Sequence, residues 1–245
     1  PARPSRPFHR RVGEEPAMIP LRDLNPSRTL PVVTVTLIAV NVLLFFYELS
    51  LGPELQPFVM QAAFVPARYL GGGPLALIPG FESALLSMFL HGGWAHIAGN
   101  MLFLWIFGDN VEDRLGHFRF LVFYLAAGFV ATATQALVSP DSGVPQIGAS
   151  GAISGVLGAY LFLFPRARVV TLLFLGFFVQ LIRVPAMVFL PLWFLLQFFS
   201  GIASLGAPSG QGGVAFFAHI GGFIAGPLLL LLLGGRRPPS APVSW

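Results

Sequence analysis

Long apolar runs alternate with short polar connections along this chain, and most of the runs approach the length of a membrane-spanning helix. A helix rises about 1.5 Å per residue, so about twenty apolar residues cross a hydrocarbon core about 30 Å thick. We expect a spanning helix at each of six segments: residues 30–49, 94–111, 118–138, 149–164, 185–205 and 214–233. The pattern predicts an all-α membrane protein built as a six-helix bundle.

The arginines set the predicted topology. All fourteen basic residues are arginine, and most lie at the ends of apolar runs. The fourteen residues between Arg168 and Arg183 would reach about 21 Å as a helix, which is too short to span, so we expect an interfacial or re-entrant insertion there. With six spans and both termini cytoplasmic, every arginine except Arg68 lies on the cytoplasmic side of the membrane. This agrees with the positive-inside rule.

The regions outside the spans divide the chain further. Residues 1–18 are rich in arginine and proline and predict a disordered basic arm, residues 19–235 form the membrane domain, and residues 236–245 form a short tail. The first seventeen residues lack the apolar core of a signal peptide, and Met18 remains an alternative start. The stretch from residue 50 to 93 is broken by glycine and proline, and we expect it to lie along the membrane interface.

Composition narrows the possible functions. The chain is 55% hydrophobic and 10% charged, whereas soluble domains are about a quarter charged. The net charge of +4 fits membrane topology better than nucleic-acid binding, because the arginines flank the spans. The absence of cysteine excludes disulfides, thiolate metal sites and cysteine nucleophiles.

Ser150 is the first candidate for chemistry. It lies in the sequence GASG, directly before an apolar run, and so at or near a helix N-terminus, where free backbone N–H groups favour an anion. Gly151, Gly155 and Gly158 share one face of that helix and allow another helix to approach closely. Taken alone, the motif is more typical of a small-residue packing face with a helix-cap serine.

His219 is the second candidate, in the sequence AHIGGFIAG. Gly222 and Gly226 form a small-residue face that could meet the glycines after Ser150. Counting back from Pro165 and Arg236 places Ser150 roughly 22 Å and His219 roughly 25 Å above the cytoplasmic boundary. At matching depth, a histidine can act as general base toward a serine hydroxyl. A structural histidine, or a haem or metal ligand, remains an alternative.

Other polar residues in the spans are few, and such residues are functional candidates by default. In HGGWAHIAGN, His96 and Asn100 share a helix face and could stabilise an oxyanion. Zinc binding by His91, His96 and His219 is the alternative, but no HExxH motif is present, so we expect no metal and no cofactor. Glu112 with Arg114 predicts a structural ion pair or a helix-end tether. Further polar residues in or beside the spans include Asn41, Glu48, Asp109, Gln135, Ser154 and Gln197.

Together these motifs resemble the rhomboid family of intramembrane serine proteases. The resemblance covers about residues 19–235 and rests on HGGWAHIAGN, VEDRLG, GASG and AHIGGFIAG, in the family's order. It implies a six-helix rhomboid-like bundle with Ser150 as nucleophile and His219 as general base, without a third acidic member. His96 and Asn100 match oxyanion-stabilising positions, joined by the Ser150 backbone N–H.

The resemblance also names residues that shape the site and one departure. His91 matches a position that helps to shape the site, and we expect the same of Gly148, Gly151 and Gly222. Some relatives carry a Trp-Arg pair in the first loop, where this chain reads AAFVPARYLGGG. No functional residue is therefore assigned to that loop.

The implied reaction is hydrolysis of a peptide bond in or near a transmembrane segment of a protein substrate. We expect the lipid bilayer and transmembrane proteins as partners and no nucleic acid; the oligomeric state is left open. Arginine usage and compact length favour a bacterial inner membrane. Two alternatives remain: an inactive rhomboid-like protein that binds transmembrane clients, which would typically lack the serine or the histidine, and a small-solute transporter, which would show internal repeats.

Overall fold

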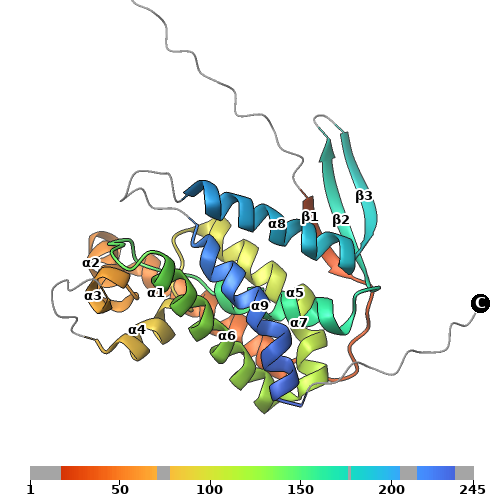
Figure 1. Ribbon diagram of the computed structural model, residues 1–245, viewed down its shortest axis with the longest axis horizontal. Helices are drawn as coiled ribbons and strands as arrows, with labels where there is room; N and C mark the ends of the chain where they lie inside the picture. Colours follow the sequence, from red (N-terminus) through yellow and green to blue (C-terminus); the bar gives the residue numbers. More distant parts are fainter. Residues whose placement is uncertain (1–17, 71–77, 176–177, 205–213, 235–245) are drawn as a thin grey trace, which may run out of the picture.

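The computed structural model describes residues 18–70, 78–175, 178–204 and 214–234. Figure 1 shows a bundle of helices with a small sheet beside one end and a group of short helices at the other. A helix lies within or across each of the six predicted segments: α1 (Val32–Ser50), α5 (Trp94–Leu115), α6 (His117–Val138), α7 (Ser150–Leu163), α8 (Ala186–Ser204) and α9 (Phe216–Leu232).

Helix α7 forms the centre of the bundle. Every residue from Gly151 to Tyr160 is buried, because α5, α6, α8 and α9 all pack against α7. Its apolar side chains join a core that includes Phe107, Phe120 and Leu230. A helix that is apolar on all sides is stable only when neighbours or lipid cover every face, and here neighbouring helices do so.

Among the described residues, three helices are long and apolar enough to cross a membrane: α1, α6 and the Ala186–Ala203 part of α8. Helices α7 and α9 are apolar but shorter. Helix α5 carries Asp109, Glu112, Asp113 and Arg114 in its last two turns and ends before Gly116, whose φ of 76° favours glycine. The count of six crossings and the cytoplasmic placement of the termini therefore stay predictions.

The fold is mostly helical, as the sequence predicts, but it is not all-α. Strands β1 (Met18–Asp23), β2 (Arg168–Leu175) and β3 (Phe178–Pro185) form an antiparallel sheet in the order β1-β2-β3. The short segment expected as an interfacial or re-entrant insertion thus supplies two of its strands. Val169 and Thr171 turn one face of β2 into the protein and are fully buried. A hairpin satisfies the backbone of an apolar run too short to span, because its hydrogen bonds close between the two strands.

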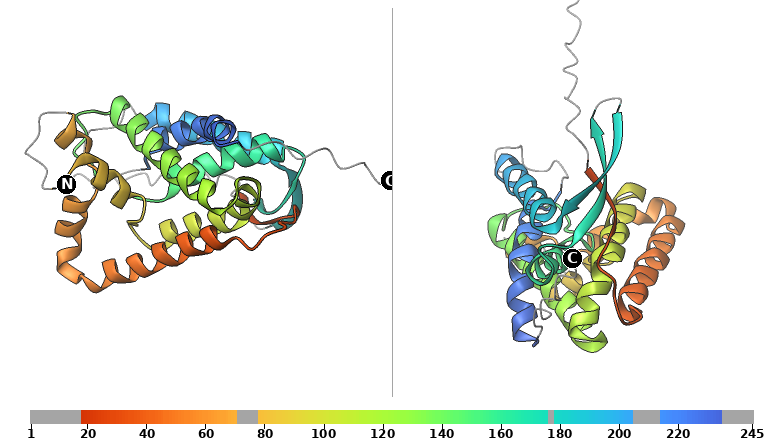
Figure 2. Two further views of the ribbon diagram at one scale, coloured as in Figure 1. Left: turned by 90° about the horizontal axis from the view of Figure 1, so that it is seen from below. Right: turned by 90° about the vertical axis from the view of Figure 1, so that its right-hand side faces the viewer.

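The stretch between α1 and α5 folds into short helices: η1 (Gly52–Glu54), α2 (Leu55–Ala62), α3 (Pro66–Tyr69) and α4 (Gly80–Ser87). They enclose a small core of Val59, Ala62, Ala63 and Leu90. Figure 2 shows them gathered at the end of the bundle away from the sheet. Their predicted position at the membrane interface stays a prediction.

The predicted terminal segments lie largely outside the described residues. Met18, the last residue of the predicted arm, belongs to β1 and pairs with Leu173. The rest of the arm and the tail at 236–245 are outside the described ranges.

Glu112 ties the start of α1 to the end of α5. Its carboxyl oxygens accept hydrogen bonds from the Val33 N–H, the Thr34 N–H and the Thr34 hydroxyl at 2.7–2.8 Å, and His117 Nδ1 lies 2.6 Å away. Free N–H groups in the first turn of a helix need such acceptors. The sequence predicts either an ion pair between Glu112 and Arg114 or a helix-end tether, and this geometry is the tether. The guanidinium of Arg114 lies over the Phe164 ring.

A second polar cluster joins β1 to the same end of the bundle. Tyr160 donates a 2.6 Å hydrogen bond to Asp23 Oδ2, and Asn110 Nδ2 donates to the same oxygen at 3.2 Å. Asn25 in turn donates from Nδ2 to Asn110 Oδ1. Burial raises the pKa of the Asp23 carboxyl from 3.8 to about 6; the Tyr160 hydrogen bond opposes this rise and the Asp109 carboxyl adds to it.

Candidate active site

The site begins with the close packing of α7 against α9. A Cβ on Gly222 would overlap the carbonyl oxygen of Gly151, and one on Gly226 would overlap that of Gly155. A Cβ on Gly158 would likewise overlap the carbonyl of Phe223. Because no side chain separates the two backbones, residues at the start of each helix are brought within reach of one another.

Ser150 and His219 are brought together by this packing. Ser150 is the first residue of α7, and His219 lies in the first turn of α9. His219 Nε2 is 2.7 Å from Ser150 Oγ, which is hydrogen-bond distance. His219 is 7% exposed, so this contact is largely shielded from solvent.

A third side chain, Gln197 of α8, fixes the orientation of the histidine. Gln197 Oε1 lies 2.7 Å from His219 Nδ1. A carbonyl oxygen can only accept, so the Nδ1 proton is placed toward Gln197 and Nε2 is left as the acceptor facing Ser150. Trp193, one helical turn earlier in α8, lies against the imidazole with ring centroids 5.9 Å apart.

Gln135 of α6 holds the start of α9. Its Oε1 accepts hydrogen bonds from the backbone N–H groups of Phe217 and Ala218 at 3.1 and 3.3 Å. The N-terminal N–H groups of a helix have no partner within the helix, so a side chain from a neighbouring helix is an effective cap. Gln135 therefore positions the turn that carries His219.

Sequence reasoning noted Gln197 and Gln135 as polar residues in spans but assigned them no role. The available signal was spacing: Gln197 follows Trp193 by four residues, so both lie on one face of an otherwise apolar helix. What that face meets depends on the tertiary packing, which spacing alone does not give.

The two predicted oxyanion residues lie beside the loop that leads to Ser150. A Cβ on Gly148 would lie 2.6 Å from His96 Nε2 and 3.5 Å from Asn100 Nδ2. The Gly92 N–H donates to His96 Nδ1 at 3.4 Å, which leaves the His96 proton on Nε2, the nitrogen facing Gly148. Gly148 has φ of 117°, so its backbone also favours glycine.

His91 lies behind these two donors. Asn100 Nδ2 is 2.9 Å from His91 Nε2, and His91 Nδ1 is 3.3 Å from the carbonyl of Phe89. The His91 backbone N–H points to the buried carboxyl of Glu48 at 3.2 Å. His91 therefore supports Asn100 rather than facing Ser150. Within the described residues, no group of three or more potential ligands could hold a metal ion.

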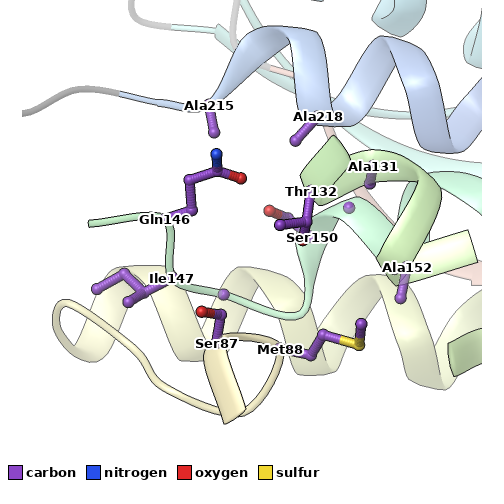
Figure 3. A pocket seen from close by; sticks show the side chains of 13 residues that line it. Ser87, Met88, Ala131, Thr132, Gln146, Ile147, Ser150, Ala152, Ala215 and Ala218 are labelled. Atoms are coloured by element: carbon purple, nitrogen blue, oxygen red, sulfur yellow. The ribbon is translucent and has the colours of Figure 1, made fainter. Parts of the chain in front are cut away.

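A pocket opens beside Ser150. Small residues line much of it, among them Gly128, Ala131, Gly151 and Ala218. Figure 3 shows the polar side chains of Gln146, Thr132 and Ser150 at this pocket. The arrangement places a serine hydroxyl, a hydrogen-bonded imidazole and a recess for a small group side by side.

Comparison with known proteins identifies the class to which this bundle and site belong. The model of the family described as Rhomboid domain matches residues 81–236, well over half of the chain. The chain belongs to the rhomboid family, whose members are generally intramembrane serine proteases. With its spanning helices, it is an integral membrane protein.

Individual relatives match shorter parts. Rhomboid protease GluP of Bacillus subtilis is 47% identical over 78 residues, 32% of this chain and 15% of the relative. The mitochondrial presenilin-associated rhomboid-like protein of Bos taurus is 34% identical over 148 residues, 59% of this chain and 36% of the relative. The chloroplastic Rhomboid-like protein 11 of Arabidopsis thaliana is 31% identical over 116 residues, 47% of this chain and 40% of the relative.

The matches cover less than half the length of each of these relatives. The relatives come from a bacterium and, by their names, from mitochondria and chloroplasts. They give no support to the expectation of a bacterial inner membrane, which stays a prediction.

Proposed function

We propose that this protein is an intramembrane serine endopeptidase that hydrolyses peptide bonds in or near transmembrane segments of protein substrates. The observation that carries the proposal is the 2.7 Å contact between His219 Nε2 and Ser150 Oγ. A serine hydroxyl bonded to the unprotonated nitrogen of an imidazole is the minimal activated nucleophile.

In the proposed reaction, Ser150 Oγ attacks the substrate carbonyl while His219 Nε2 takes its proton. His219 then gives that proton to the leaving amine, and water releases the acyl-enzyme by the reverse sequence. The tautomer favoured by Gln197 is the one this step needs, because Nε2 must be free to accept.

Gln197 is the proposed positioning residue in this mechanism. When His219 becomes an imidazolium, both its nitrogens donate, and the carbonyl of Gln197 can continue to accept from Nδ1. This is the place that an aspartate takes in a catalytic triad. A neutral amide orients the ring without adding a carboxylate to a buried site.

The oxyanion would be held by donors around Gly148. His96 Nε2–H and the second N–H of Asn100 are directed to this region, and the Ser150 backbone N–H is free at the start of α7. Donors already fixed in place stabilise developing charge without reorganisation. His96 and Asn100 are therefore proposed as oxyanion ligands, with His91, Gly148, Gly151 and Gly222 shaping the site.

A rhomboid-like protein without activity that binds transmembrane clients is the second candidate. It predicts binding with no covalent chemistry at Ser150. The Ser150–His219 contact favours the protease, because a purely binding role does not require this geometry.

The test is cleavage of a reporter transmembrane protein by the purified chain in lipid vesicles. We expect wild type to cleave, and both Ser150→Ala and His219→Ala to lose activity by a factor of about 10³ or more. A serine-directed phosphonate should label Ser150 in the wild type but not in Ser150→Ala or His219→Ala. Ser154→Ala is the matched control, because its hydroxyl donates to the Ser150 carbonyl rather than to the imidazole. Cleavage that survives Ser150→Ala would contradict the mechanism.

A further inference from the structure

The hairpin of β2 and β3 has an exposed apolar end. On β3, the side chains of Phe178, Val179 and Leu181 are 74%, 54% and 65% exposed. β3 is also the last strand in the order β1-β2-β3, so among the described residues one of its edges has no partner strand. Contiguous apolar surface and a free sheet edge both promote association in water. An apolar surrounding for this end of the hairpin is therefore favourable.

One face of the sheet is divided into a basic zone and an apolar zone. Directly paired residues share a face of a sheet, and every second residue along a strand returns to that face. The register therefore places three exposed arginines on one face near the base of the hairpin: Arg22, Arg168 and Arg183. Toward the tip, the same face carries apolar residues: Ile19, Leu172, Phe174, Val179 and Leu181. Charge and apolar surface are thus separated along the length of the hairpin.

The base of the hairpin lies where a candidate membrane helix begins. β3 ends at Pro185, and α8, which is long and apolar enough to cross a membrane, starts at Ala186. The Ala186 N–H donates to the carbonyl of Ala167 at 2.8 Å, and the Met187 N–H donates to that of Pro165 at 2.9 Å, so the base is fixed to this junction. Figure 1 shows the hairpin leaving the bundle beside the start of α8 and extending past the helices. With α8 in the bilayer, the basic zone is level with the lipid headgroups.

We propose that the β2–β3 hairpin binds the surface of a bilayer that contains anionic lipids, with its basic zone on the headgroup phosphates and its apolar zone among the upper acyl chains. Charge selects this partner, because arginine bonds strongly to phosphate and the ion pairs among the described residues include none of these three arginines. The free edge of β3 limits the depth, since unpaired backbone groups do not enter the hydrocarbon core. The apolar side chains therefore reach only about 5–10 Å below the headgroups. This inference does not depend on protease activity.

The test uses one fluorophore per molecule, which is possible because the chain has no cysteine. Val179→Cys carries the environment-sensitive dye NBD in full-length protein reconstituted into vesicles of phosphatidylcholine with about one third phosphatidylglycerol. We expect strong quenching by lipids with a nitroxide near the headgroup and weak quenching by lipids with a nitroxide near the end of the acyl chain. A label at Asp141→Cys, in the exposed polar loop between α6 and α7, is the matched control and should be quenched by neither.

The role of charge is tested by Arg183→Gln in the Val179-labelled protein. An arginine at an anionic surface changes the ratio of bound to free hairpin about fivefold, so we expect the variant to lower that ratio by about this factor. Arg28→Gln is the control, because Arg28 is exposed but lies outside the sheet. Equal quenching of the labels at residues 179 and 141 would overturn the inference. So would a label that is shielded from water but not quenched by lipid, since a protein partner or a second copy then covers the hairpin. Binding that is unchanged in pure phosphatidylcholine would exclude anionic lipid as the partner.

Discussion

The two ends of the bundle carry polar clusters that differ in what their hydrogen bonds join. At the end near the sheet, Glu112 and Asp113 accept hydrogen bonds mainly from backbone N–H groups and two threonine hydroxyls at or just before the start of α1. At the other end, Ser150 and His219 bond to each other, and His219 also bonds to Gln197.

The difference separates polar groups that hold the chain from polar groups that can act on another molecule. The oxygens of a carboxyl that caps a helix already accept hydrogen bonds from the protein's own backbone. The Ser150 hydroxyl, which lines a pocket, can still accept a hydrogen bond from a ligand while it donates to His219. Burying a polar group in a membrane protein is unfavourable. A buried polar group that can still bond to a ligand is therefore a better indicator of function than one whose hydrogen bonds are all made within the fold.

The largest expected effect in this comparison is on stability. Glu112→Ala leaves the N–H and hydroxyl of buried Thr34 without an acceptor, so we expect the free energy of unfolding to fall by at least about 3 kcal/mol. Thermal unfolding in detergent measures this loss.

Asp113→Ala is the control for that change. It also removes hydrogen bonds, to the Thr29 N–H and hydroxyl, but these are exposed and water can replace them. We expect a loss of no more than about 1 kcal/mol. Equal losses in the two variants would contradict the assignment of Glu112 as the principal tether.

A smaller effect, confined to catalysis, is expected at the other end. Gln197→Leu removes the acceptor at His219 Nδ1, so we expect kcat to fall about tenfold with KM nearly unchanged, because the imidazole loses its preferred tautomer. Nitrogen NMR of labelled histidine should show the Nδ1–H form in wild type and a mixture in the variant. Gln197→Glu keeps an acceptor and should restore the Nδ1–H signal. An unchanged spectrum in Gln197→Leu would exclude the positioning role.

The smallest effect is a change in how stability depends on pH. The raised pKa of Asp23 means that the folded protein holds a proton between about pH 4 and pH 6 that the unfolded chain has released. Stability contributed by this group is therefore lost as the pH rises through that window. Asp23→Asn cannot titrate at this position. The melting temperature of the variant minus that of wild type should therefore rise from pH 4 to pH 6 and then level off. A constant difference would show that Asp23 titrates normally.

The positions of the helices could be predicted from the sequence because a long apolar run has few other solutions in a membrane. The hairpin could not be predicted, because a short apolar run such as VVTLLFL is compatible with a strand or a buried helix. Its partner strand, β1, lies about 150 residues earlier in the chain. Pairing at that distance leaves no local signal.

The candidate site likewise has features that local sequence predicts and features that depend on tertiary packing. The glycine faces after Ser150 and His219 are spacings within one helix each, so the sequence indicated that these two residues would meet. Gln197 acquires its role only from the residue that lies opposite it. The sequence shows Gln197 as a polar residue in an apolar helix, but it does not show that His219 lies within hydrogen-bond distance.

The pairing of β1 with β2 also constrains the order of assembly during synthesis. Met18 pairs with Leu173, so the strand closest to the start of the described chain has no partner until α1, α5, α6 and α7 have all been made. The Glu112 tether can form much earlier, as soon as α5 is complete. Closure of the sheet is thus a late event that joins the earliest and later parts of the chain, and contacts of such large sequence separation form slowly.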